Sequence, residues 1–332
     1  MNGIVLLAKQ KGLTSFSSLG VVKKSLNTKK VGHTGTLDSF AQGLLVVCAG
    51  SLTRLAGCIT EFDKSYKAVI KFGEETDTLE YTGEIVRTGE LPAKEKVIDA
   101  VKHFTGEQNQ IPPLFSAIHV DGKRASDLAR KGKSAEIPSR KITVYKAEIM
   151  DFLCNEENKV IACMVDFTVS KGTYIRSLAR DIGDYCESAG HLIGLCRTRV
   201  GNFKIEDAAG YEFLDDFSIK TALADSENFK NGKMEEANPR KHDIELKVQI
   251  PERLKSFDKE TAALCGFNSV SIKNQEYDFA FRNGKPVWYK WFNENLFETK
   301  TENVAVFNSD GSFAGLIHRV NEKKFGYSFV VN

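Results

Sequence analysis

Five segments of the chain have the apolar pattern of β-strands. Residues 3–9 and 43–49 are almost unbroken apolar runs, which is typical of strands buried on both faces. In 66–73 and 158–170 apolar and polar positions alternate, which predicts strands with one buried face. A fifth strand is predicted at 142–153.

Helical spacing appears between these strands. A helix is predicted at 15–27, with Ser15 as its N-cap, and another at 173–187. A third is opened by Pro92 and ended by Gly106. The predicted inward faces are Phe16, Leu19, Val22 and Leu26 in the first helix, and Val97, Ile98, Val101 and Phe104 in the third. Because strands and helices do not alternate regularly, the pattern indicates an α+β fold.

Composition divides the chain into two parts. Residues 1–222 hold all the elements above, and 223–245 is polar and poor in large apolar side chains, so it is predicted to be a linker. Residues 246–332 contain short strand-like runs separated by the turn signals Asn283-Gly284 and Asp310-Gly311. They predict a small β-rich domain.

Overall composition excludes several classes of protein. Apolar residues make up 42% and charged residues 27%, as in folded proteins that are not membrane-embedded. No apolar run approaches the roughly 20 residues of a membrane-spanning helix, and the first apolar run lacks the basic start of a signal peptide. The seven cysteines form no CxxC pair, which argues against a zinc site or a disulfide framework and favours a reducing cytoplasm.

The charges are segregated although the net charge is only +2. Residues 1–60 carry seven bases and one acid, residues 61–100 ten acids and six bases, and residues 119–145 seven bases and three acids. Such segregation suits a face that binds a polyanion. Solvated helix faces would give a similar distribution, so the charges alone leave both interpretations open.

Asp38 lies in the segment richest in candidate chemistry. Residues 32–38 read GHTGTLD, and Asp38 is the only acid among the first sixty residues. A carboxylate among bases stays ionised and can act as a nucleophile or charge stabiliser. From this segment alone the favoured interpretation is that Asp38 caps a turn and that His33 is a hydrogen-bonded loop residue.

Two further clusters follow. Residues 170–176 read SKGTYIR and place Arg176 near a helix N-terminus, where a cation is favourable only beside a carboxylate; the alternative is a surface arginine. Residues 110–132 begin with two prolines and turn basic, typical of a flap that grips phosphate.

The chain's only GKS, at 132–134, lacks the glycine of a Walker motif, and no GxGxxG follows a strand, so no nucleotide cofactor is indicated.

In this order the three clusters resemble the TruB-type tRNA pseudouridine synthases, over about residues 1–210. The resemblance identifies Asp38 with the catalytic aspartate, Tyr66 with the active-site tyrosine and Arg176 with the arginine that pairs with the aspartate. It implies a mixed, mainly antiparallel sheet flanked by helices, an inserted "thumb" at about 110–141 and a small C-terminal β-barrel-like domain. Residues 246–332 are weakly similar to the PUA-type RNA-binding domains.

The resemblance also implies a set of substrate-binding residues. Residues 195–203 read LCRTRVGNF, in which Leu195 would help line the base pocket. The full set is His33, Tyr174, Leu195, Lys123, Arg124, Arg130 and Arg140. Four positions depart from the family pattern and bear on loop rigidity and neighbouring hydrogen bonds more than on the reacting groups: Gln10, Ser39, Glu80 and Phe115.

The implied reaction is isomerisation of the uridine at position 55 in the T arm of tRNA. It needs no metal, cofactor or group donor. The flipped-out base and the basic segments imply tRNA as the partner, with no membrane and no protein partner, and a monomer is the simplest state. Two other hypotheses remain, a tRNA-binding protein that remodels RNA without catalysis and a synthase of the same superfamily acting on another RNA.

Overall fold

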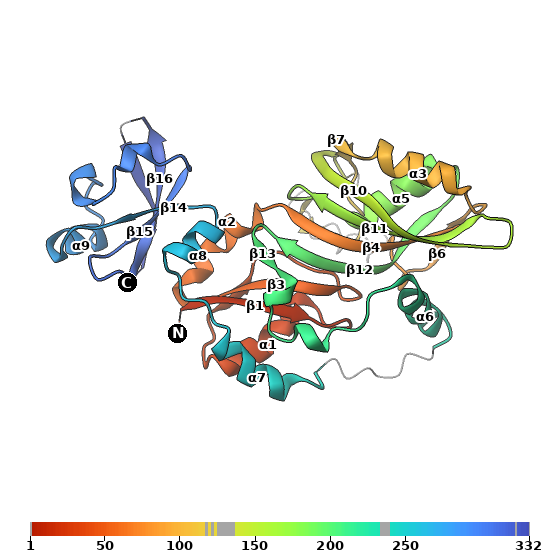
Figure 1. Ribbon diagram of the computed structural model, residues 1–332, viewed down its shortest axis with the longest axis horizontal. Helices are drawn as coiled ribbons and strands as arrows, with labels where there is room; N and C mark the ends of the chain where they lie inside the picture. Colours follow the sequence, from red (N-terminus) through yellow and green to blue (C-terminus); the bar gives the residue numbers. More distant parts are fainter. Residues whose placement is uncertain are drawn as a thin grey trace.

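The structure is a computed structural model. It describes residues 2–116, 137–232, 240–322 and 324–331, together with the backbone of 119–120 and 123–124. A large body and a smaller C-terminal lobe lie side by side (Figure 1). Among the described residues no helix is long and apolar enough to cross a membrane.

A nine-stranded sheet forms the centre of the large body (Figure 1). Its main path runs β1-β3-β12-β4-β11-β10-β7, with β2 beside β3 and β13 beside β12. Only the short β3–β12 pairing is parallel, so the expected mixed, mainly antiparallel sheet is confirmed. The strands are β1 Gly3–Lys9, β2 Val31–His33, β3 Gln42–Ala49, β4 Lys64–Phe72, β7 Gly106–Gln110, β10 Arg140–Cys154, β11 Val160–Val169, β12 Gly190–Val200 and β13 Phe203–Lys204.

Both faces of this sheet are covered, which explains the unbroken apolar runs. In β1, Leu6 belongs to one buried cluster and Val5 to another on the opposite face. Two short hairpins stand apart from the sheet. They are β5 Glu74–Thr76 with β6 Ile85–Thr88, and β8 His119–Val120 with β9 Lys123–Arg124.

Helices complete the large body. α3 and α5 contribute to the buried cluster around β4 and β11, and α1 packs with α7 against β1 and β3. The helices of this body are α1 Ser15–Ser25, α2 Ala56–Thr60, α3 Lys94–His103, α5 Ile175–Tyr185, α6 Ile219–Lys230 and α7 Asp243–Glu252.

Two details of the predicted helices are wrong. The N-cap of α1 is Thr14, whose hydroxyl accepts a hydrogen bond from the Ser17 amide, and Ser15 lies inside the helix. Phe16 is 73% exposed and Ile98 48% exposed. In α1 the inward face includes the small side chains Ser15 and Ser18, which let the helix approach closely, and Phe16 therefore lies outside it.

The linker predicted at 223–245 is also wrong at both of its ends. α6 continues to Lys230 and α7 begins at Asp243. The buried positions of α6 include the small residues Ala222 and Ser226, so a segment poor in large apolar side chains still packs as a helix.

The C-terminal lobe contains an open four-stranded sheet, β14-β15-β16-β17, in the part of the lobe that is described. Asp310-Gly311 forms the predicted hairpin turn between β15 and β16. Asn283-Gly284 does not form one, because the residues before it form a helix that ends at Arg282, with Asn283 as its C-cap. The elements are α8 Lys259–Leu264, β14 Asn268–Ser271, α9 Gln275–Arg282, β15 Asn303–Phe307, β16 Phe313–Asn321 and β17 Lys324–Val330.

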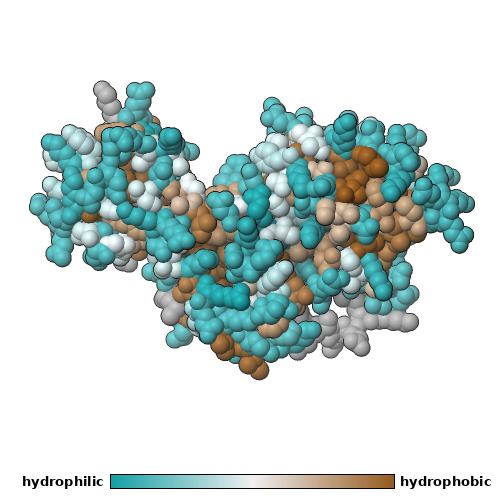
Figure 2. Space-filling view, in the orientation of Figure 1, coloured by the Kyte–Doolittle hydropathy of each residue, from teal (hydrophilic) through white to brown (hydrophobic). Residues whose placement is uncertain are grey.

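The lobe and the large body share a core. Phe307 and Leu316 on one face of the small sheet belong to the same buried cluster as Leu6 and Leu44 of the large sheet. Apolar side chains are visible at the narrow waist between the two parts (Figure 2). The position of the lobe is therefore set by packing and not only by the connecting chain.

Candidate active site

Asp38 and Arg176 come together although 138 positions separate them. Asp38 lies in the loop between β2 and β3, and Arg176 lies in the first turn of α5. Arg176 Nη2 donates to Asp38 Oδ1 at 3.2 Å, and Arg176 Nε lies 3.1 Å from Oδ2. The Asp38 side chain is 35% exposed and that of Arg176 only 7%, so the carboxylate faces an opening while the cation beneath it is buried.

Further acceptors hold the Arg176 guanidinium in place. Nη1 donates to the carbonyl of Thr78 at 2.9 Å and Nη2 to that of Phe115 at 3.0 Å. These carbonyls and the Asp38 carboxylate offset the cost of burying a cation near a helix N-terminus. The pairing expected of Arg176 is present in the structure.

Tyr66 and Leu195 lie in the same buried cluster as Leu37, the neighbour of Asp38. Tyr66 extends from β4 and Leu195 from β12, and the backbone of Tyr66 is paired with Phe167 on β11 and Arg197 on β12. Tyr66 is 8% exposed and Leu195 5% exposed. The sheet thus places an aromatic ring and an aliphatic side chain in the apolar cluster that continues into the loop that carries Asp38.

Comparison with known proteins identifies the family. Residues 23–175 match the model of the TruB family pseudouridylate synthase (N terminal domain). A tRNA pseudouridine synthase B from Treponema denticola is 40% identical over 88% of this chain and 85% of its own. One from Borreliella burgdorferi is 38% identical over 84% of this chain and 99% of its own.

The chain belongs to the TruB family of pseudouridylate synthases. It is therefore an enzyme that isomerises uridine in RNA. A solved Cbf5-Nop10-Gar1 complex contains a chain with the same fold, at a TM-score of 0.61 and 24% identity over 99% of this chain and 84% of that one.

His33 ends β2, five residues before Asp38. The Gly35 amide donates to His33 Nδ1 at 3.4 Å, so this nitrogen is an acceptor. Burial lowers the pKa of His33 below its usual range, and the positive charge of Arg197 acts in the same direction. In this TruB-family site His33 is therefore a neutral imidazole beside the loop at neutral pH.

Tyr174 lies at the N-terminus of α5 and is fixed through Gln110, which is 1% exposed. Gln110 accepts from the Tyr174 amide at 2.8 Å and donates to its carbonyl at 3.0 Å. The Arg140 guanidinium lies 5.3 Å from the centre of the Tyr174 ring, a cation–π contact. Lys123 and Arg124 are described only as backbone of the β8–β9 hairpin, and Arg130 lies outside the described residues.

A cleft of about 530 Å³ opens beside this region. It is lined by residues of β7, of the start of β10 and of the loop before α5: Glu107, Gln108, Asn109, Lys141, Ile142, Thr143, Ser170 and Lys171. The cleft thus lies where the inserted segment leaves and rejoins the sheet. The part of the chain that is described contains no group of three or more residues suited to hold a metal ion.

The departure at Glu80 places a second carboxyl group near the Asp38–Arg176 pair. Glu80 is 9% exposed; Oε1 accepts from the Thr82 hydroxyl, and Oε2 is buried without a hydrogen-bond partner. Burial raises the pKa of Glu80 to about 7, and the negative charge of Asp38 acts in the same direction. Glu80 therefore exchanges its proton near neutral pH.

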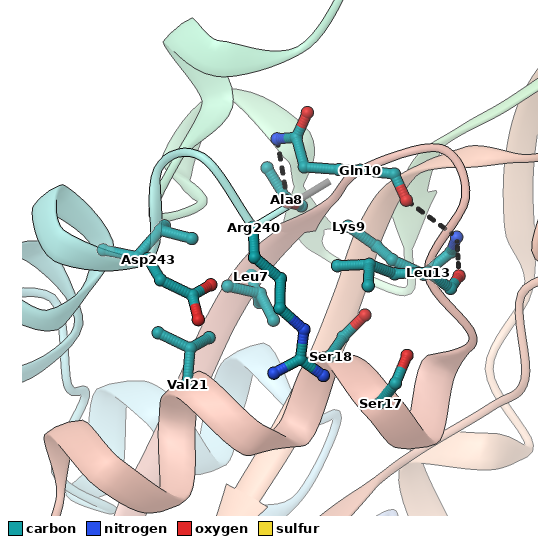
Figure 3. A pocket seen from close by; sticks show the side chains of 11 residues that line it. Leu7, Ala8, Lys9, Gln10, Leu13, Ser17, Ser18, Val21, Arg240 and Asp243 are labelled. Carbon is teal, nitrogen blue, oxygen red and sulfur yellow. Dashed lines mark hydrogen bonds between the residues drawn. The ribbon is translucent and has the colours of Figure 1, made fainter. Parts of the chain in front are cut away.

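No role was predicted from the sequence for Lys9 or Arg197. Lys9, the last residue of β1, is 1% exposed and donates to the carbonyls of Leu13 and Gln10 beside a cavity of about 20 Å³ (Figure 3). Burial lowers its pKa to about 7, although the charge of Asp38 opposes the shift.

Arg197 is 2% exposed and donates to carbonyls of the loop that carries Asp38, at Gly35 and Thr36. It is brought there by close contact of β3 and β12, since a side chain at Gly43 would collide with the Arg197 backbone. A basic residue near the end of an apolar strand is a sequence signal that could have pointed to either residue.

Proposed function

We propose that this pseudouridylate synthase acts on tRNA and isomerises the uridine at position 55 of the T arm, with Asp38 as its catalytic group. The observation that carries the proposal is the contact of a partly exposed Asp38 with a buried Arg176. The substrate is inferred from relatives named tRNA pseudouridine synthase B, which match most of the chain.

The reaction rearranges bonds within one nucleotide. The bond between uracil N1 and ribose C1′ breaks, the ring rotates, and C5 bonds to C1′; C5 loses a proton and N1 gains one. Asp38 serves as nucleophile or charge stabiliser at the ribose or the base, and Arg176 holds it ionised and oriented. Tyr66 stacks on the uracil and takes part in the proton transfer at C5.

The target uridine must leave the folded T loop to reach this site. Unstacking costs about a few kcal/mol, which contacts with the protein must offset. Leu195 and Tyr66 provide apolar surface for the extruded base. His33, uncharged at neutral pH, occupies the space that the base leaves.

Phosphates of the tRNA are held by the basic segments on either side. Exposed lysines lie between α1 and β2, and Lys141 and Lys171 line the cleft at the base of the inserted segment. Arg140, which precedes Lys141, contacts the Tyr174 ring. Lys123, Arg124 and Arg130 of the thumb-like insertion 110–141 belong to the same proposed surface. Binding should therefore weaken as salt concentration rises.

The proposed organisation is a catalytic domain that includes α6 and α7 and a PUA-like RNA-binding domain in the C-terminal lobe, acting as a monomer in the cytoplasm. The shared core is compatible with this division, because it joins two separate sheets without adding a strand to either. The free thiols of the described residues suit a reducing compartment.

The deciding experiment compares wild type with Asp38→Asn on an unmodified tRNA transcript and maps any pseudouridine formed. We expect wild type alone to convert the T-arm uridine, while both proteins bind the tRNA. Conversion by both would remove Asp38 from its role. Binding without conversion by either would favour the remodelling protein, and modification elsewhere would change the substrate and keep the chemistry.

A further inference from the structure

Ser15 makes an unusual pair of hydrogen bonds with the catalytic loop. Its hydroxyl accepts from the Leu37 amide at 2.8 Å and donates to the Leu37 carbonyl at 3.0 Å. Both partners belong to the residue immediately before Asp38, and Ser15 is 2% exposed. One side chain of α1 therefore satisfies both backbone groups of Leu37.

The capping role expected of Ser15 does not explain these bonds. Thr14 caps α1 by accepting from the Ser17 amide, and Ser18 donates to the Thr14 carbonyl within the same helix. Of these three hydroxyl side chains, only Ser15 reaches the loop. Its partner lies 22 residues away, so the bond is tertiary and not part of the helix end.

The loop is held from its other side as well. Arg197 donates to the carbonyls of Gly35 and Thr36, each at 3.2 Å. The Gly12 amide donates to the Ser39 carbonyl at 2.8 Å. Three consecutive residues before Asp38 and the one after it are thus anchored to α1, β12 and the loop after β1, while the Asp38 side chain itself contacts only Arg176 among the hydrogen bonds and ion pairs of the described chain.

We propose that Ser15 is a positioning residue for the isomerisation, because its hydroxyl fixes the Leu37 backbone and thereby aims the Asp38 carboxylate at the flipped nucleotide. The inference rests on the proposed role of Asp38. Without the hydroxyl, the Leu37 amide and carbonyl lose their partner between two anchored neighbours, and the loop can rotate there. A misplacement of about 1 Å at a reacting group can cost about a hundredfold in rate.

The test separates chemistry from RNA binding. Ser15→Ala is compared with wild type by single-turnover conversion of a tRNA transcript at saturating enzyme, and by the equilibrium Kd for the same tRNA. Ser18→Ala is the matched control, because Ser18 is also a buried serine of α1 but its bond stays within the helix. Thermal melting of each variant sets an assay temperature at which all are folded.

We expect Ser15→Ala to lower the single-turnover rate about tenfold to a hundredfold, with the Kd for tRNA unchanged. Ser18→Ala should keep both the wild-type rate and the wild-type Kd. Ser15→Thr keeps the hydroxyl and should recover most of the rate. If Ser15→Ala is unfolded at every usable temperature, Ser15→Cys replaces it, since a thiol is only a weak donor and acceptor.

Other outcomes overturn the proposal. A Ser15→Ala enzyme with the wild-type rate, or one whose rate falls no more than that of Ser18→Ala, shows that Ser15 only stabilises α1. An increase in Kd with no change in the saturated rate would instead assign Ser15 to RNA binding. Asp38→Asn is measured alongside: if it stays active, the proposed role of Asp38 has failed, and if it is inactive while Ser15→Ala is unaffected, only the positioning inference has failed.

Discussion

The large body and the C-terminal lobe bury different kinds of side chain. Around Asp38 the buried groups include Arg176, Arg197, Lys9 and Glu80, each with backbone or side-chain partners. In the described part of the lobe the one buried polar residue is Thr261. Burying charged groups is costly, so their concentration in one region marks where the structure fixes geometry and not merely stability.

Among the buried charged groups near Asp38, substitution of Arg176 is expected to lower the reaction rate most. Arg176→Lys keeps the charge, but an ammonium group cannot bond Asp38 and the carbonyls of Thr78 and Phe115 with the same geometry. We expect the single-turnover rate at saturating tRNA to fall about a hundredfold or more, the scale of losing a preorganised donor. Arg180→Lys on the same helix is the control, and equal losses in both variants would contradict the assignment.

A second prediction concerns pH and Glu80. The pKa of Glu80 in the folded state, about 7, lies above the ordinary glutamate value of 4.5, so between these pH values the folded state holds a proton that the unfolded state releases. The contribution of Glu80 to the free energy of unfolding is therefore largest below pH 4.5 and is lost as the pH rises towards 7. Above pH 7 the cost of the buried charge is constant, at about 3 kcal/mol.

Glu80→Gln removes this titration. Denaturant unfolding should show the variant gaining stability relative to wild type as pH rises from 4.5 to 8, whereas Glu84→Gln on the exposed hairpin should follow wild type. Lys9 and His191 also have shifted pKa values, but they are present in both proteins. The difference in stability between wild type and Glu80→Gln therefore reports on Glu80 alone. A constant difference across this range would show that Glu80 stays ionised.

A smaller effect is expected in the core of the lobe. Ile317 is fully buried in the cluster formed by α9 and the small sheet. Ile317→Val should lower the free energy of unfolding by about 0.5–1.5 kcal/mol, with no change in single-turnover rate below the melting transition. A reduced rate in the folded variant would show that lobe packing influences the catalytic loop, and would break the contrast between the regions.

The smallest effect is expected from a single surface charge. Lys30 is exposed just before β2, and Lys30→Gln should reduce the salt dependence of tRNA binding by about one unit of slope, without affecting the saturated rate. Lys102→Gln, an exposed lysine of α3, is the control. Equal slopes for both variants and wild type would remove Lys30 from the proposed RNA surface.

Within the large body, the strands and the Asp38–Arg176 pair differ in how well the sequence predicted them. Strands such as 3–9 and 158–170 were predictable because apolar periodicity follows directly from which faces are buried. The Asp38–Arg176 pair was predictable only through the family resemblance, because nothing local in the sequence joins positions 138 apart.

Ser15, Arg197 and Gln110 were not assigned their roles for the same reason. Each bonds backbone groups of a distant segment, and a backbone partner leaves no signal in residue type. The errors at Phe16 and at the linker have a different origin. Small residues on the inner faces of α1 and α6 allow close packing that a search for large apolar side chains overlooks.

The core shared through Phe307, Leu316 and Leu6 makes the lobe and the large body one mechanical unit. The distance between Asp38 and any surface of the lobe is then the same in the free protein as in the complex with RNA. A rigid folded RNA that touches both must present its uridine at that distance from its second contact. The enzyme would thus select its target partly by the distance between two contact points on the RNA. The sequence around the uridine would be recognised only at the contact near Asp38.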